Sequence, residues 1–439
     1  MIDLIESPWL AYAMLVLVTV VARLRCGSWF APAAFVGLVW SFFTGASLLV
    51  VDYAVPGRGL WMLVLLVVAI QFGALIAREL QPPSRSSLRP GWDNVFDVLI
   101  VPCRRYSLLC TAVAFAGCIY FLFTSLDDFG LPFTTLGVLE VGARWRTLRY
   151  DDALEPWSVR VLITWLHPAA LLGGILFACS RKRLDRASAI VSLLPAVAYG
   201  VLTGARGPIL LGLTCWIGGY VATLCIQTRR RMAMFSARRL ALLVLAAAAM
   251  VGMFVFIDAA KNVSWNQDFE LDANEQRLDD YLFGSPAAFA GWYAHADIED
   301  VEWGGRTFAG EFDMLGFRRR AVGAYSENSN VVGTELTNVY TLFRGLIEDF
   351  TEIGAVLVAV SIGGFAGWMY RLRFKNALGA VFWLSAFYSA FLFSPLVSLF
   401  SFNGATLAWV VAWFVLASAK PRSPVFRLPH ITAQEAPAQ

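Results

Sequence analysis

The chain has 439 residues, of which 58% are hydrophobic and only 15% are charged, and its formal net charge is +3. Soluble domains carry about 25% charged residues, so this composition excludes an ordinary soluble protein. It predicts an all-α fold, a polytopic integral membrane bundle whose spans are helices. No basic domain is present, which argues against nucleic-acid binding.

Apolar runs of about 17 to 25 residues predict eleven membrane spans. In chain order the predicted spans cover residues 8–24, 30–51, 60–77, 105–124, 159–179, 187–203, 207–226, 240–257, 350–370, 377–396 and 404–419. The opening stretch "MIDLIESPWL" lacks the basic residues that begin a cleavable signal peptide, so the first span is expected to be retained.

The distribution of Lys and Arg predicts the orientation in the membrane. With the N-terminus outside, most of the 35 Lys and Arg residues fall in cytoplasmic loops, and most of the 32 acidic residues lie outside. The C-terminus is then inside. The predicted parts are residues 1–257 with spans 1–8 and an outer loop at 125–158, a large outer loop at 258–343, residues 344–419 with spans 9–11, and a tail at 420–439.

The large outer loop is rich in Trp, Gly and charged residues. A structureless loop of that length is unusual in a compact protein, so amphipathic helices are expected there, on the outer membrane surface. The seven Cys and three His residues show no metal-ligand spacing, so no disulfide, metal site or cofactor is expected.

The first outer loop contains "VGARWRTLRYDD", in which Arg144, Arg146 and Arg149 lie within an otherwise acidic outer face. Positive charge concentrated on a negative surface attracts an anion such as a diphosphate. The simpler interpretation is a solvated loop in which these arginines pair with nearby acids.

The turn "TGARGPIL" interrupts a long apolar stretch at the predicted outer face. Gly204 and Gly207 allow close approach of the backbone, and Pro208 suits the first turn of the next helix. Arg206 adds a planar cation with forked donors that match phosphate oxygens. Alternatively, Arg206 reaches lipid headgroups beside an ordinary helical hairpin.

A later stretch, "NVYTLFRGLIEDFTEIGA", places charged residues where an apolar helix begins. A helix from about Tyr340 would place Tyr340, Arg344 and Glu348 on one face, with Asp349 beside it. Charged groups at membrane depth cost about 2.5–3.5 kcal/mol each, so they pair or line a polar cavity. Either Arg344 and Glu348 form a salt bridge that only holds the helix end, or Arg344 binds phosphate while an acid orients a hydroxyl.

Four stretches resemble the oligosaccharide repeat-unit polymerases, the O-antigen (Wzy-type) polymerase family. In chain order they are "TGARGPIL" at 203–210, "YLFGSPAAFAGWY" at 281–293, "GRTFAGEF" at 305–312 and "TNVYTLFRGLIEDFTEIGA" at 337–355. The resemblance covers roughly residues 200 to 370, and the N-terminal half is similar only in hydropathy. Thr351 is a departure, because a glycine commonly follows the acidic-Phe pair in that family.

The resemblance implies a glycosyltransferase at the periplasmic face of a bacterial inner membrane. Such enzymes transfer a growing chain from undecaprenyl diphosphate to a new lipid-linked oligosaccharide and release undecaprenyl diphosphate, with no metal or other cofactor. The implied partners are the lipid-linked oligosaccharide, the growing polysaccharide (O-antigen, capsule or exopolysaccharide), membrane lipid and a chain-length regulator protein.

This reaction needs cations beside a leaving diphosphate and a carboxylate, here Asp349, Glu348 or Glu335, that orients or deprotonates a hydroxyl. Aromatic residues of the outer loop such as Trp292 can stack on sugars or anchor the interface. The candidate catalytic residues are Arg206, Arg344, Glu348 and Asp349. The candidate substrate-binding residues are Arg144, Arg146, Arg149, Gly204, Gly207, Trp292, Arg306, Asn338 and Tyr340.

Three other functions are considered. An O-antigen ligase would transfer the same chain to lipid A core, and His295 is the histidine of the large outer loop that could serve it. Another polyprenyl-phosphate-dependent glycosyltransferase would need a metal-binding acidic pair, for which Asp127 and Asp128 are available. A lipid-linked sugar flippase should line its cavity with charges along several spans, and the predicted span interiors here are nearly free of charge.

Overall fold

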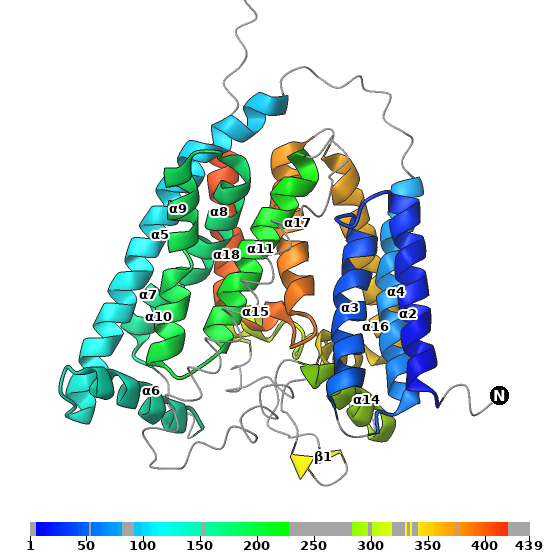
Figure 1. The fold of residues 1–439 in the computed structure, drawn as a ribbon, viewed down its shortest axis with the longest axis horizontal. Coiled ribbons are helices and arrows are strands. Elements are labelled where there is room, and N and C mark those ends of the chain that lie inside the picture. Colours follow the sequence, from blue (N-terminus) through cyan, green and yellow to red (C-terminus); the bar gives the residue numbers. More distant parts are fainter. Residues whose placement is uncertain are drawn as a thin grey trace, which may run out of the picture.

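The computed structural model describes residues 6–51, 54–80, 92–150, 155–227, 283–296, 301–317, 330–331, 334–335, 341–373 and 376–419. The predicted helical class is confirmed, since helices dominate these residues (Figure 1). The helices are α2 (Pro8–Cys26), α3 (Pro32–Val50), α4 (Gly57–Glu79), α5 (Trp92–Phe129), α6 (Thr135–Tyr150), α7 (Trp157–Ile163), α8 (Leu166–Cys179), α9 (Arg183–Val191), α10 (Leu194–Leu202), α11 (Gly207–Gln227), α14 (Ser285–His295), α15 (Ala309–Met314), α16 (Leu342–Leu372), α17 (Ala377–Phe393), the 3₁₀ helix η1 (Leu399–Ser401) and α18 (Asn403–Ser418). Two short strands, β1 (Asn330–Val331) and β2 (Thr334–Glu335), pair antiparallel.

The protein is a multi-pass membrane protein. Within the described residues, eight helical segments are long and apolar enough to span a bilayer. They are Pro8–Cys26, Pro32–Val50, Gly57–Glu79, Phe96–Phe129, Trp157–Cys179, Arg183–Leu202, Gly207–Ile226 and Leu342–Leu372. The shorter apolar helices α17 and α18 coincide with the predicted spans 377–396 and 404–419. The predicted span 240–257 lies outside the described residues, so the count of eleven stays a prediction.

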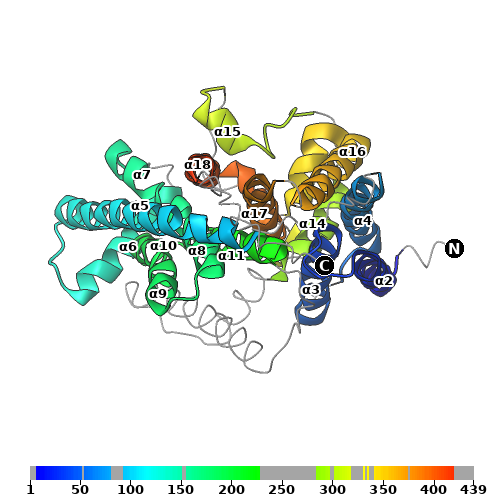
Figure 2. The ribbon, with the colours of Figure 1, turned by 90° about the horizontal axis from the view of Figure 1, so that it is seen from above.

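The bundle has two sides joined by central helices (Figures 1 and 2). Helices α2, α3, α4 and α16 form one side, and α5 to α10 form the other. Helices α11 and α17 lie between them, and they pack against each other. Trp40 and Tyr388 are fully buried in the apolar core of the first side, where Trp40 stacks on Phe343.

Glycines bring α4 and α16 close together. A side chain at Gly363 or Gly367 would collide with the backbone carbonyl oxygens of Ile70 or Ala74, and one at Gly73 would collide with that of Val360. Small residues four apart are a common packing device between membrane helices, where lipid supplies little hydrophobic drive for association. These glycines hold the part of α16 around residues 360–367 firmly against α4.

The two ends of the bundle differ in their structure. At the upper end in Figure 1, Arg371 donates to the carbonyl oxygen of Arg78 at 3.0 Å, and Arg78 in turn donates to that of Arg25. These contacts join the ends of α16, α4 and α2. The lower end carries the short helices α6, α14 and α15 (Figure 1). Helices were predicted in the large loop, and α14 and α15 are present there. Helix α14 is not the amphipathic surface helix that was predicted, because its residues 285–291 are all buried.

Candidate functional site

The charged stretch at the start of α16 lies on a broken helix. Helix α16 begins at Leu342, with Thr341 as its N-cap, and its backbone is interrupted at Thr351 (φ 63, ψ 176). This conformation is almost confined to glycine, so Thr351 is strained. It is the residue that stands where the resembled family commonly has glycine. The predicted face shared by Arg344 and Glu348 is present, while Tyr340 lies outside the described residues.

A loop from residue 301 to 308 fills the break in α16. The backbone N–H of Glu302 donates to the carbonyl oxygen of Glu348 at 3.1 Å, and that of Trp303 donates to the carbonyl oxygen of Asp349 at 3.2 Å. Carbonyl groups at the end of a helical segment lose their intrahelical partners, and the loop replaces those partners. The loop is thereby fixed beside Glu348.

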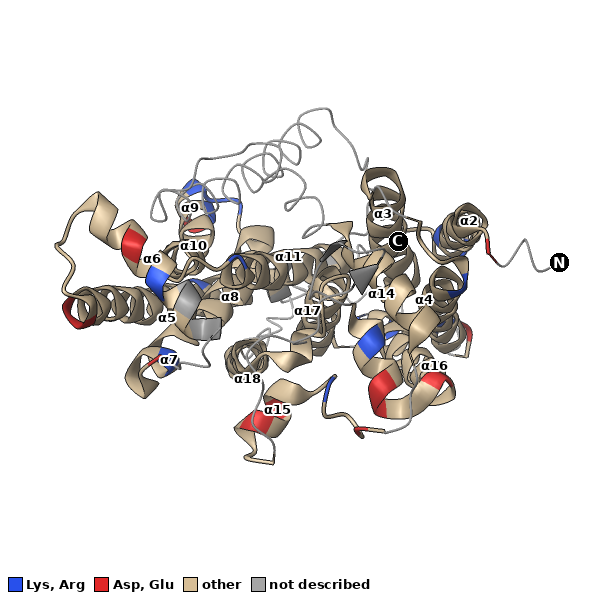
Figure 3. Cartoon of the chain, turned by 90° about the horizontal axis from the view of Figure 1, so that it is seen from below, with Lys and Arg blue, Asp and Glu red and all other residues tan. Residues whose placement is uncertain are grey.

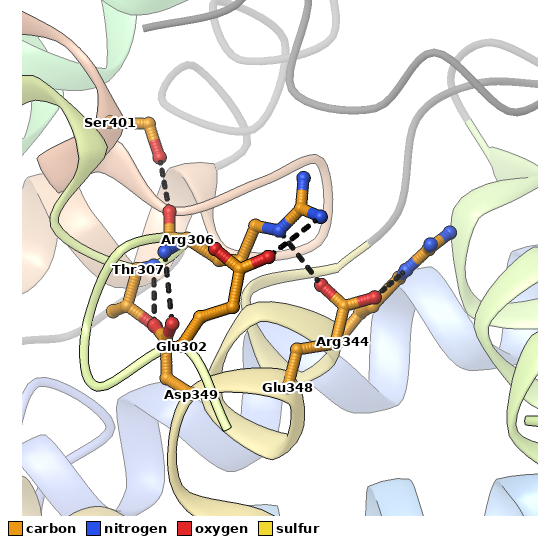
Figure 4. Close-up of polar contacts among 7 residues, drawn as sticks. All are labelled: Glu302, Arg306, Thr307, Arg344, Glu348, Asp349 and Ser401. Carbon is orange, nitrogen blue, oxygen red and sulfur yellow. Dashed lines mark hydrogen bonds and ion pairs between the residues drawn. The ribbon is translucent and has the colours of Figure 1, made fainter. Parts of the chain in front are cut away.

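Asp349 fastens the same loop through its side chain. Its carboxylate is fully buried, with Oδ1 accepting from the backbone N–H of Arg306 at 2.9 Å and Oδ2 accepting from that of Thr307 at 2.6 Å (Figure 4). Both oxygens are therefore occupied by the protein. Asp349 thereby fixes the position of the Arg306 backbone.

Two arginines from different segments meet at one carboxylate (Figure 4). Arg344, whose residue exposure is 4%, donates from Nε to Oε1 of Glu348 at 2.7 Å. The Nε atom of Arg306 lies 3.6 Å from Oε2 of the same carboxylate, and Arg306 also pairs with Glu302 at 3.0 Å. Buried charges remain stable only when they are paired. The two cations are held side by side, and Arg306 is the more exposed of them, with 36% of its side chain accessible.

Helix α14 contributes an aromatic side chain, Trp292, that packs against Arg344. The Arg344 guanidinium carbon lies 4.9 Å from the ring centroid of Trp292, a favourable cation–π contact. Arg344 thus contacts Trp292 in addition to Glu348. Trp292 was predicted to meet sugar or the membrane interface, and that prediction remains open for the part of the ring that Arg344 does not cover.

The turn between α17 and α18 supports the loop from its other side. Ser398 donates to the carbonyl oxygen of Thr307 at 2.7 Å, and Ser401 donates to that of Arg306 at 3.2 Å. Sequence reasoning did not single out these serines. The hydroxyl residues that recur in the apolar run "SPLVSLFSF" are the signal that could have found them.

Helix α15 extends the same attachment to α18. Asn403 donates to Asp313 at 2.9 Å, and Thr406 donates to Glu311 at 2.6 Å. Burial raises the pKa of Glu311 above its ordinary value, and the Thr406 hydrogen bond opposes the shift. The site loop is thus tied to α16 at one end and to α18 at the other.

The predicted arginines of the first outer loop lie on the other side of the bundle. Arg144 pairs with Glu140 at 2.7 Å and also contacts the carbonyl oxygen and ring of Phe129. This local pairing matches the simpler interpretation in kind. Arg146 and Arg149 are on α6, and their side chains lie outside the described part of the structure. Helix α6 packs on α5 and α10, away from α16 in both views (Figures 1 and 3).

The predicted glycine–arginine turn joins α10 to α11. Gly204 has a positive φ of 57, as a tight turn requires, and Gly142 of α6 packs closely against its backbone. Gly207 begins α11, and Arg206 is partly buried just before it. The described contacts therefore place this turn beside α6. A role of Arg206 together with Arg344 stays a prediction, and Asn338 lies outside the described residues.

A contact at the same end joins Tyr293 of the aromatic outer loop and Glu352 of the charged stretch to Arg58, which sequence reasoning missed. The Tyr293 hydroxyl donates to Glu352, and Arg58 at the start of α4 lies 5.8 Å from the Tyr293 ring centroid. Burial, together with the hydrogen bond to Glu352, raises the pKa of Tyr293 to about 12, although Arg58 opposes the shift. Only the folded chain brings α4, α14 and α16 to one place, so no local pattern predicts this set.

Chemically, the group around Glu348 is suited to an anion. Two guanidinium groups, one buried and one accessible, offer forked donors that match phosphate oxygens. Glu348 Oε2 is buried and makes no hydrogen bond within the described structure, and it lies 3.6 Å from Nε of Arg306. Comparisons of this chain with protein-family models, with curated proteins and with solved structures found no match.

Proposed function

We propose that this protein is a polysaccharide polymerase of the bacterial inner membrane. It joins oligosaccharide repeat units carried on undecaprenyl diphosphate and releases undecaprenyl diphosphate. It crosses the membrane eleven times, with the N-terminus outside and the C-terminus inside. The site around Glu348 then faces the periplasm. The observation that carries the proposal is the pairing of Arg344 and Arg306 across one carboxylate at the end of the bundle that bears α14 and α15.

The proposed reaction uses these groups as follows. The bond from the anomeric carbon of the growing chain to the diphosphate oxygen breaks, and a bond to the acceptor hydroxyl oxygen forms. Arg344 and Arg306 stabilise the negative charge on the departing diphosphate, and a low-dielectric setting strengthens this effect. The hydroxyl proton passes to Glu348, and the carboxylate between the two arginines is thereby neutralised as the diphosphate charge develops beside them. Asp349 is a positioning residue, since its oxygens hold the loop of Arg306.

The test is chain growth in cells. Arg344→Ala and Arg306→Ala are each expected to abolish polymer longer than one repeat unit while the protein still accumulates in the membrane. Arg160→Ala is a matched control, because Arg160 is an exposed arginine on α7 at the same end of the bundle. Its chain lengths should equal those of the wild type. Normal polymer in the Arg344→Ala cells would refute the proposal.

Three further measurements separate the rival functions. A ligase would leave polymer on its lipid carrier but lose attachment to core when Arg344 is removed. A metal-dependent glycosyltransferase would lose chain elongation in the presence of a chelator, whereas elongation by this protein is expected to persist. A flippase in liposomes would move lipid-linked sugar without lengthening it.

A further inference from the structure

A second arginine–aromatic group lies next to the first one on α14. Arg58 is exposed in the first turn of α4, and its guanidinium carbon lies 5.8 Å from the Tyr293 ring centroid. Tyr293 donates its hydroxyl proton to Glu352, just beyond the break in α16. Three elements that are distant in the sequence therefore meet at one cation.

The charge of Arg58 is available to a ligand. Among the described residues Arg58 forms no ion pair, and its partner is the neutral side chain of Tyr293, whose hydroxyl donates to Glu352. The first turn of α4 has no acidic residue, and its N-cap Pro56 makes no side-chain hydrogen bond. The partial positive charge of this helix start adds to that of Arg58. The Tyr293 phenol is protonated at neutral pH, as its ordinary pKa already requires, so it adds no negative charge.

Each of the two groups consists of one arginine and one aromatic ring of α14. Trp292 and Tyr293 are consecutive on α14, with ring centroids 6.4 Å apart. Arg344 lies over the first ring and Arg58 lies near the second. The backbone of α14 is pressed against the start of α4, because a side chain at Gly59 would collide with the backbone of Ala290. The spacing of the two cations is thus fixed by packed backbone.

The two arginines, Arg344 and Arg58, differ in how far they are exposed. Arg344 is 4% exposed and bonded to Glu348, which suits a group that stabilises charge as it develops. Arg58 is exposed at the edge of the bundle, which suits a ligand that binds and leaves without reacting. The proposed reaction involves two diphosphates of this kind, because the donor releases one while the acceptor unit keeps its own.

We propose that Arg58 binds the diphosphate of the acceptor, the second polyprenyl-linked unit, while Arg344 and Arg306 bind the diphosphate that leaves. This inference rests on the proposed polymerase function. No bond is made or broken at Arg58, so Arg58 is a binding residue that sets acceptor affinity. Glu352 fixes the orientation of Tyr293, and the Tyr293 ring contacts Arg58.

The test is a reconstituted elongation assay in which donor and acceptor concentrations are varied separately. Arg58→Ala should raise the acceptor concentration for half-maximal rate at least tenfold, with the donor dependence and the maximal rate within twofold of wild type. Arg58→Lys should recover part of the acceptor affinity. Arg344→Ala should instead lower the maximal rate at every acceptor concentration. Unchanged acceptor dependence in Arg58→Ala would overturn the inference.

Direct binding separates this failure from failure of the proposed function. The probes are geranylgeranyl diphosphate, inorganic pyrophosphate and nanodiscs rich in phosphatidylglycerol. Wild-type protein should bind the first two, and Arg58→Gln should lose one of two geranylgeranyl diphosphate sites. No binding of diphosphate by the wild type would refute the polymerase itself. Two sites retained in Arg58→Gln, or an effect of Arg58 on phosphatidylglycerol alone, would refute only the role of Arg58.

Discussion

The buried carboxylate of Asp349 acts on geometry, because its two oxygens already accept the backbone N–H groups of Arg306 and Thr307. Asp349→Asn replaces one acceptor with an NH₂ group that must face an N–H donor. Leaving a buried donor unsatisfied costs about 1–3 kcal/mol. We expect a lower thermal unfolding temperature in detergent and faster proteolysis of the 301–308 loop, together with reduced chain elongation.

Glu348→Gln is the comparison for that experiment. The Glu348→Gln substitution removes the negative charge between Arg344 and Arg306 but leaves the backbone contacts of the 301–308 loop in place. Elongation should therefore fall more than tenfold, while the loop stays protected from protease.

If Asp349→Asn proved as stable as wild type yet inactive, Asp349 would take part in the chemistry and its positioning role would be wrong.

Thr351 stores strain at the break in α16, where its φ of 63 and ψ of 176 suit glycine. Such a conformation costs about 1–3 kcal/mol in a residue with a side chain. Thr351→Gly should therefore raise the unfolding temperature. Ser361→Gly, on the continuous part of α16, should lower it, because glycine in a helix interior costs about 0.5–1 kcal/mol. Equal shifts in both variants would show that the break does not strain the chain.

At the scale of elements, glycine contacts hold α4 against the part of α16 that follows its break. Gly363→Ala would drive a methyl group into the carbonyl oxygen of Ile70, whereas at Gly364 the nearest atom, the carbonyl oxygen of Gly73, would be 3.8 Å away. Overpacking costs about 1–3 kcal/mol. We expect Gly363→Ala to lower both the thermal stability and the elongation rate. Gly364→Ala meets no close atom and removes a glycine from a helix interior, so it should raise the unfolding temperature slightly and leave the elongation rate unchanged. Thermal unfolding and polymer length are the measurements.

The break in α16 also accounts for how the four charged residues at its start are paired. These residues are Arg344, Glu348, Asp349 and Glu352. An unbroken helix would carry Glu348 and Glu352 on one face with a single cation, Arg344. The break lets the 301–308 loop bring Arg306 to Glu348, and it turns Glu352 towards Tyr293. Each acid thereby gains a partner from another segment.

At the scale of the whole molecule, the two ends should face different compartments. Asp128, at the lower end of α5, and Arg181, between α8 and α9, are at opposite ends of the bundle. In intact cells, Asp128→Cys should react with a membrane-impermeant maleimide. Arg181→Cys should react only after the membrane is opened, and wild-type protein gives the background from the native thiols. The reverse labelling pattern would place the site around Glu348 inside the cell, where no outward-facing lipid-linked sugar reaches it.

The sequence by itself determined the class of the protein and most of its spans. Hydropathy reports the solvent of each helix, and a span of apolar residues must be helical because lipid cannot satisfy an open backbone. The pairing of Arg344 with Glu348 was also readable, since i and i+4 residues share a helical face. The break at Thr351 was not predicted. The departure from the resembled family at that position only put the helix geometry in question.

Only the tertiary structure decided which distant groups meet. It brought Arg306 to Glu348 and set Asp349 to hold the loop, while the described contacts placed the predicted turn of Arg206 beside α6. It also joined Arg58 to Tyr293 across α4 and α14. These contacts depend on helix packing through glycine and on loop closure over many residues, and neither leaves a periodic trace in the chain.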